Sequence, residues 1–234
     1  METLLVFALW CGVWILTLVV PPGSKEIFTA YRINFLHGLT GSVMAILALL
    51  GVVDDNVATM TTVSYFMVDF VNILINDFYH RVPSYQSPSA RKVEYVHHIL
   101  CCTVGIMSEL MYDQFCTFKR NPFILLMFAE FSTPFLIAWR YTQNTFLGVL
   151  FITTFIGCRI VYHGLFLIPD CMRSCHWSVG YGFGVPYDAM NLYFLAMIFR
   201  KLWKKPSSKL GGQEGEESGS KTDDKMNSKT KKKA

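Results

Sequence analysis

Seven apolar runs, each close to the length that a helix needs to cross a lipid bilayer, constrain the fold of this chain more than any other feature. A spanning helix needs about 20 mostly apolar residues, and backbone groups in hydrocarbon must pair internally, which favours helices. The sequence therefore predicts an all-α membrane protein with about seven transmembrane helices. The predicted spans are Thr3–Val20, Ile33–Val53, Val57–Ile75, Glu94–Tyr112, Asn121–Trp139, Thr145–Ile168 and Val185–Trp203.

Proline, glycine and short polar segments separate these runs. Pro21-Pro22-Gly23 cannot continue the first helix. Residues 76–93, which contain prolines, and the glycine-rich residues 169–184 are predicted to be loops. The first run has Glu2 in place of a basic leader and no small-residue cleavage site, so we expect an uncleaved span over residues 1–22.

The charge of the chain is concentrated in its last segment. Only 16% of the residues are charged, whereas about a quarter is usual in soluble domains. Residues 204–234 hold nine lysines and five acidic residues, and the rest of the chain is neutral, so the net charge of +4 belongs to this tail. A basic segment directly after an apolar helix is typical of a cytosolic membrane flank and does not indicate nucleic-acid binding.

Lysine and arginine are distributed asymmetrically between the two predicted faces of the membrane. With seven spans and a cytosolic C-terminus, seventeen of these residues lie on the cytosolic side and three on the lumenal side, while Arg159 lies within the membrane. The positive-inside rule therefore predicts a lumenal N-terminus and a cytosolic C-terminus.

The basic tail also contains a possible targeting signal. Residues 206–234 are polar and low in aromatic side chains, which predicts disorder. Lys231 and Lys232, at the fourth and third positions from the end of the sequence, resemble the dilysine retrieval signal of endoplasmic reticulum membrane proteins. This predicts residence in the endoplasmic reticulum and binding to a COPI-type coat. The alternative is a lysine-rich tail that touches anionic lipid.

Three cysteines fall in segments that this topology places in the lumen. Because disulfides form in oxidising compartments, we expect a disulfide between two of Cys116, Cys171 and Cys175. The order of Cys171, Cys175 and His176 is only a weak match to a metal site, and no metal is predicted.

Ionisable side chains inside the spans carry most of the functional information, because each costs several kcal/mol in hydrocarbon and therefore faces the bundle interior or water. Counting about 1.5 Å per residue places four of them in one layer near the cytosolic boundary, with Asn72 one turn closer to the cytosol. These four are His37, Asp69, His97 and His98.

Two further sets lie deeper. Glu130 and Arg159 are both near the middle of their spans, so we expect an ion pair. His163 and Asp188 form a third set towards the lumen.

A histidine next to an aspartate can act as a general base, or can itself attack an acyl thioester that approaches from the cytosol. Neighbouring residues on a helix point in different directions, so only one of His97 and His98 is expected to face Asp69. The alternative for all of these polar residues is a structural role in helix packing.

Several of these motifs resemble those of the TLC-domain family. The matching segments are Tyr65-Phe66-Met67-Val68-Asp69, Val96-His97-His98-Ile99, Ala129-Glu130-Phe131-Ser132-Thr133-Pro134-Phe135 and Arg159-x-x-x-His163. The resemblance covers roughly residues 30–205. It implies a six-helix bundle around a central cavity, preceded in this chain by one extra span and followed by the tail of residues 206–234.

The family includes ceramide synthases, a translocon-associated protein, a cargo receptor and small members tied to membrane phospholipid composition. The histidine pair of the ceramide synthases maps onto His97 and His98. Their two aspartates do not map onto this chain, where the nearest positions hold Glu130 and Thr133. This departure disfavours ceramide synthesis, and the form Glu130-Phe131-Ser132-Thr133-Pro134 resembles the small TLC-domain members.

Three functions follow as expectations. The first is a role in membrane sphingolipid or phospholipid homeostasis, with membrane lipids as partners. The second is acyl-CoA-dependent N-acylation of the ceramide synthase type, with acyl-CoA as substrate and no resident cofactor. The third is cargo binding or trafficking in the endoplasmic reticulum.

Overall fold

The computed structural model describes residues 2–19, 26–80, 88–117 and 120–203. In these ranges the chain is helical, apart from short turns and one isolated β-bridge between Cys116 and Cys175. The all-α prediction is therefore confirmed for the described part of the chain. Lys231, Lys232 and the rest of the predicted tail lie outside it, as does Pro83.

The helices are α1 (Glu2–Val19), α2 (Glu26–Leu49), α3 (Asp55–Leu74), η1 (Ile75–His80), α4 (Pro88–Phe115), α5 (Pro122–Leu126), η2 (Met127–Ser132), α6 (Thr133–Thr142), α7 (Thr145–Phe155), η3 (Ile156–Leu167), α8 (Ile168–Ser174), α9 (Trp177–Val179), η4 (Gly180–Gly184) and α10 (Val185–Trp203).

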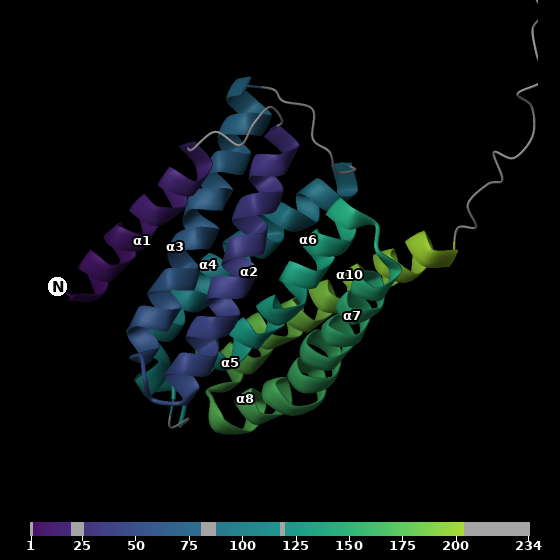
Figure 1. Ribbon diagram of the computed structural model, residues 1–234. Coiled ribbons are helices and arrows are strands. Elements are labelled where there is room, and N and C mark those ends of the chain that lie inside the picture. The colour runs from purple at the N-terminus through teal and green to yellow at the C-terminus, as the bar shows by residue number, and fades with distance from the viewer. Residues whose placement is uncertain (1, 20–25, 81–87, 118–119, 204–234) are drawn as a thin grey trace, which may run out of the picture.

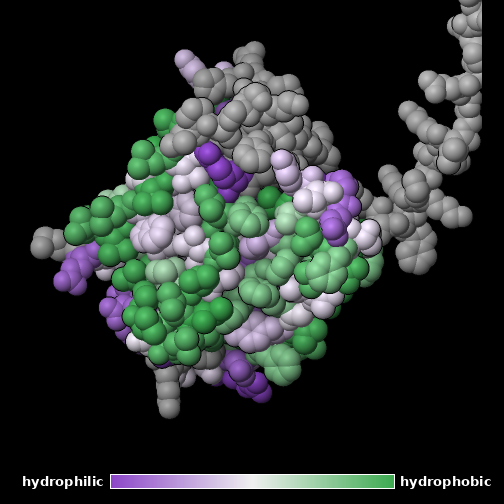
Figure 2. All heavy atoms as spheres, viewed as in Figure 1, coloured by the Kyte–Doolittle hydropathy of each residue, from purple (hydrophilic) through white to green (hydrophobic). Residues whose placement is uncertain are grey.

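Five helical segments in the described ranges are long and apolar enough to cross a membrane. They are Glu2–Val19, Arg32–Leu49, Asp55–Tyr79, Pro122–Thr142 and Thr145–Ser174. The predicted spans Glu94–Tyr112 and Val185–Trp203 form the helices α4 and α10 but are not among these five. Figure 2 shows that hydrophobic side chains cover much of the face in view, with hydrophilic ones towards its edges.

The helices form a bundle in which α3 packs against α1, α2 and α4, while α2 also contacts η2 and α6 (Figure 1). Helix α1 exposes most of its leucines and buries Trp14, whose indole nitrogen donates to the Ser64 hydroxyl at 3.2 Å. A helix with an apolar outer face and one anchored inner side chain is suited to a lipid environment.

One predicted loop is wrong, and a second is wrong in the parts that the structure describes. Residues 169–184 form α8, α9 and η4 instead of an irregular loop. Pro169 stands in the first turn of α8, where a missing N–H costs little, and the His176 side chain caps α9 by accepting from Ser178 N. The described parts of 76–93 are also helical, because Pro88 begins α4 rather than interrupting it.

Arg91 joins the start of α4 to η1. Its guanidinium donates to both carboxylate oxygens of Asp77 and to Glu94, with distances between 2.7 and 2.8 Å. The hydrogen bonds to Asp77 raise the pKa of the Arg91 guanidinium, so it stays charged. This ion pair fixes how α4 begins against α3. It thereby positions His97 and His98, which lie one to two turns further along α4.

Candidate functional site

A buried hydrogen-bonded cluster connects α2, α3 and α4. The Nε2 atom of His98 lies 2.9 Å from Oδ2 of Asp69. The Tyr65 hydroxyl lies 3.2 Å from the same oxygen and donates to the side chain of Asn34. The prediction that one histidine of the pair faces Asp69 is confirmed, and the residue is His98.

Both ring nitrogens of His98 face oxygen atoms. Nδ1 lies 2.9 Å from the backbone carbonyl oxygen of Glu94, and Nε2 faces Asp69. A neutral imidazole donates from only one nitrogen, whereas an imidazolium donates from both. The geometry therefore fits an imidazolium paired with the Asp69 carboxylate. In that state His98 has no free nitrogen to accept a proton or attack an acyl group.

His97 projects from α4 in a different direction from His98, although its ring lies 5.7 Å from that of His98, centroid to centroid. Its ring packs edge-on against Phe66 and Phe194, and its Nδ1 lies 3.5 Å from the Cys101 sulfur. A thiol is a weak hydrogen-bond partner. Of the two adjacent histidines, His97 is thus the one with a ring nitrogen that can serve as base or nucleophile.

His37 links this cluster to the second predicted layer. Its ring stacks on Tyr65 with a centroid distance of 3.6 Å, and its Nε2 lies 3.7 Å from Oε2 of Glu130. The residue is 1% exposed, and neither ring nitrogen has a hydrogen-bond partner. The two layers expected from sequence are therefore one continuous polar core.

The expected Arg159–Glu130 pair is present in the middle of the bundle. Arg159 Nη2 lies 3.3 Å from Oε1 of Glu130, and Arg159 Nε donates to the Ala129 carbonyl at 3.0 Å. The Thr133 hydroxyl donates to Oε2 of Glu130 at 2.9 Å. Glu130 is 6% and Arg159 7% exposed, so each charge is compensated in a buried environment.

Irregular helical segments carry both Glu130 and Arg159. Pro134 has no N–H to donate to the carbonyl of Glu130, and the chain there is a tight helix, η2, that passes into α6 at Thr133. Arg159 lies on η3, a wide helical segment of the kind often found at functional sites.

Other predicted residues lie apart from this core. The Asn72 side chain accepts from Asn76, and His163 Nε2 lies 3.3 Å from the Leu125 carbonyl oxygen. The Asp188 carboxylate lies 3.8 Å from the position that a Cβ on Gly164 would occupy. Within the described ranges no hydrogen bond or ion pair joins His163 to Asp188.

Sequence reasoning missed Tyr65, although a signal was available. Tyr65 and Asp69 are four residues apart, which places both on one face of α3. The sequence prediction includes Tyr65 only within a motif, whereas its hydroxyl and ring contact three polar residues of the core.

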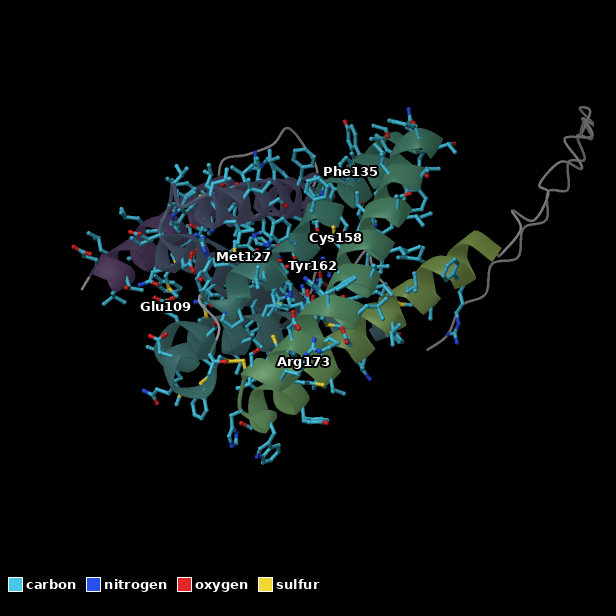
Figure 3. All side chains as sticks on the ribbon, turned by 90° about the horizontal axis from the view of Figure 1, so that it is seen from below. Glu109, Met127, Phe135, Cys158, Tyr162 and Arg173 are labelled. Atoms are coloured by element: carbon cyan, nitrogen blue, oxygen red, sulfur yellow. A yellow bond between two sulfur atoms is a disulfide. The ribbon has the colours of Figure 1, made fainter. Side chains whose placement is uncertain are left out.

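An apolar cavity of about 140 Å³ begins beside the polar core. Along α4 its lining extends from Leu100 to Phe115, about 22 Å at the rise of a helix. Met127, labelled near the centre of the bundle in Figure 3, also lines it. Thr62 and Glu130 contribute polar groups to a lining that is otherwise mostly hydrocarbon, aromatic ring or sulfur.

A disulfide between Cys116 and Cys175 lies at the other end of the cavity. Figure 3 shows it between the helices that carry Glu109 and Arg173. The expected disulfide among the three loop cysteines is confirmed, while Cys171 is a free, buried thiol in the cavity lining. In the described ranges no three His, Cys, Asp or Glu side chains are grouped to hold a metal ion.

Comparison with protein-family models, with curated protein sequences and with solved structures finds no match to this chain.

Proposed function

We propose that this chain is a multi-pass protein of the endoplasmic reticulum membrane, with a TLC-type bundle, that holds lipid hydrocarbon in its central cavity and acts in membrane lipid homeostasis. In this proposal α4 and α10 also cross the membrane, which gives six bundle helices after the N-terminal span α1. Five sufficiently apolar helices and the motif resemblance support this arrangement.

The observation that carries the proposal is the apolar cavity. A lining of leucine, methionine, valine and phenylalanine side chains favours hydrocarbon over water. The ion pairs at Asp69 and Glu130 are buried beside it and rigidify the surrounding helices. Ligand sites between bundle helices commonly combine a large apolar surface with a few polar groups.

The proposed topology has a lumenal N-terminus and a cytosolic C-terminus. The disulfide supports it, because its cysteines then lie in an oxidising compartment. The excess of lysine and arginine on the opposite side points the same way. Residence in the endoplasmic reticulum would depend on the tail lysines Lys231 and Lys232, through a COPI-type coat.

Lipid analysis of the purified protein tests the proposal. Val104 lines the cavity, whereas Ile99 on the same helix is 52% exposed. Val104→Trp should fill the cavity and remove co-purifying lipid that is not exchanged by detergent washing. Ile99→Trp adds the same side chain on the outer surface and should leave the bound lipid unchanged. Equal lipid content in both variants and the wild type would exclude the cavity as the lipid site.

A second function, acyl-CoA-dependent N-acyl transfer, is favoured by the histidines at the cytosolic end of the core. Here His97 would take the proton or the acyl group, and His98 would fix the position of α4 through its pair with Asp69. Purified protein supplied with acyl-CoA and a sphingoid base should then form ceramide.

Substitutions of the two histidines should have different effects in such an assay. His97→Ala should abolish turnover and leave the protein folded, while His98→Ala should also lower its thermal stability by removing the partner of Asp69. Absence of product above background across acyl-chain lengths would leave lipid binding without catalysis.

A further inference from the structure

The cavity is not apolar along its whole length. Away from the disulfide, its lining includes the side chains of Thr62 and Glu130. Both lie close to Gly41 of α2: a Cβ there would be 3.6 Å from the Thr62 hydroxyl oxygen and 3.8 Å from Glu130 Cβ. Because Gly41 has no side chain, α2 leaves room next to both of these residues.

These two groups have unused hydrogen-bonding capacity. The Thr62 hydroxyl is buried and has no partner, although a hydroxyl can donate once and accept twice. The Glu130 carboxylate receives hydrogen bonds from Thr133 and Arg159, and a carboxylate offers about four acceptor sites. A buried polar atom without a partner is costly, so a ligand that pairs with it gains affinity.

The charges around this end of the cavity are already balanced. Glu130 is paired with Arg159, and Asp69 is paired with His98. A ligand that brought an ammonium or carboxylate group here would add a buried charge without a counter-charge, which is unfavourable. The site therefore selects an uncharged group that both donates and accepts a hydrogen bond.

We propose that the cavity binds an apolar lipid that ends in a single uncharged hydroxyl group. The ligand hydroxyl donates to Glu130 and accepts from Thr62. The part of the hydrocarbon next to the hydroxyl fills the cavity along α4, and the remainder extends past Met107, which lines the cavity and is 36% exposed. This inference rests on the proposed lipid-binding function and names the chemical class of the ligand. A long-chain alcohol and a sterol share this chemistry.

The experiment uses the full-length protein in detergent micelles and a photoreactive 1-hexadecanol as probe. Unlabelled competitors are 1-hexadecanol, its methyl ether, hexadecylamine, palmitic acid and cholesterol. We expect competition by the free alcohol at concentrations about tenfold lower than by the ether, since one hydrogen bond contributes about a factor of ten. The amine and the acid should compete no better than the ether.

Thr62→Val keeps the shape of the side chain but removes its hydroxyl. It should weaken the binding of both the alcohol and the ether about tenfold, because an ether oxygen can also accept from Thr62. Thr61→Val is the matched control. The Thr61 hydroxyl donates to the backbone carbonyl of Val57 at 2.8 Å, and Thr61 does not line the cavity. A second readout is the alkylation of Cys101, which lines the cavity and should be protected by the bound alcohol.

The outcomes separate this inference from the function on which it rests. Stronger competition by cholesterol than by 1-hexadecanol would identify a sterol, and the reverse a straight-chain alcohol; both support the inference. Equal binding of alcohol, ether, amine and acid, unaffected by Thr62→Val, would overturn it and leave a cavity that binds any hydrocarbon. Absence of specific labelling by every probe, with Cys101 alkylated at the same rate throughout, would overturn the lipid-binding function as well.

Discussion

Replacing Arg159 by methionine removes the guanidinium that compensates the Glu130 carboxylate in the middle of the bundle. At the observed 3.3 Å and an effective dielectric constant of about 20, the attraction between the two charges is about 5 kcal/mol. Removing one partner of a buried pair usually costs about 3–5 kcal/mol, because the other charge remains buried. Thr133 still donates to Glu130, which places the expected loss for Arg159→Met near the lower value, about 3 kcal/mol.

Unfolding of the purified protein in detergent measures this loss. For a chain of this length, about 3 kcal/mol corresponds to a fall in melting temperature of roughly 6–12 °C. Arg159→Met combined with Glu130→Gln removes both charges and should recover most of the stability that the single Arg159 substitution loses.

The matched control is Arg173→Met. Arg173 pairs with Asp170 at 2.5 Å, but both side chains are more than half exposed. Arg173→Met should change the free energy of unfolding by less than about 1 kcal/mol. If Arg159→Met is no more destabilising than Arg173→Met, or if the double substitution is as unstable as the sum of the single ones, the two charges do not compensate each other inside the bundle.

Three further predictions concern packing, the disulfide and the tail. Gly105→Ala places a methyl group against the Val63 side chain and should cost about 1–3 kcal/mol by overpacking, measured by thermal unfolding; Gly12→Ala meets no atom within 4 Å and should be tolerated. Cys116→Ser should lower stability by about 4 kcal/mol, given that the bond to Cys175 closes a loop with a sequence separation of 59, and reduction of the wild type should reproduce this loss. Serine in place of the two lysines of the predicted retrieval signal should move the protein to later secretory compartments, and unchanged reticular staining would refute the signal.

The polar core shows how far sequence reasoning reaches. The number and spacing of charged residues in apolar runs predicted the Arg159–Glu130 pair, since an isolated buried charge is too costly to remain unpaired. The difference in direction between adjacent helix residues predicted that one of His97 and His98 faces Asp69. Sequence did not identify which one, because that depends on the rotation of α4 about its own axis.

The prediction of a loop at residues 169–184 is wrong because tertiary packing overrides local helix propensity there. Glycine lowers helix propensity by about 1 kcal/mol per residue, but propensity is overridden when a segment packs tightly. A Cβ on Gly184 would lie 3.1 Å from the Ile168 side chain, so glycine there allows η4 and α8 to approach closely. At Gly184 the absence of a side chain permits packing between helices, and the chain continues directly into α10.

The sequence alone determined that the described chain is helical and largely suited to lipid, because hydrophobic content and helix periodicity are local properties that each segment carries by itself. It also determined which polar residues need partners. Tertiary structure alone decided which partners they have. Both nitrogens of His98 are engaged, His37 joins the two layers, and Thr62 and Glu130 both line an apolar cavity. These contacts join different helices, and their distances depend on the tilt and rotation of each helix in the bundle, which no single segment encodes.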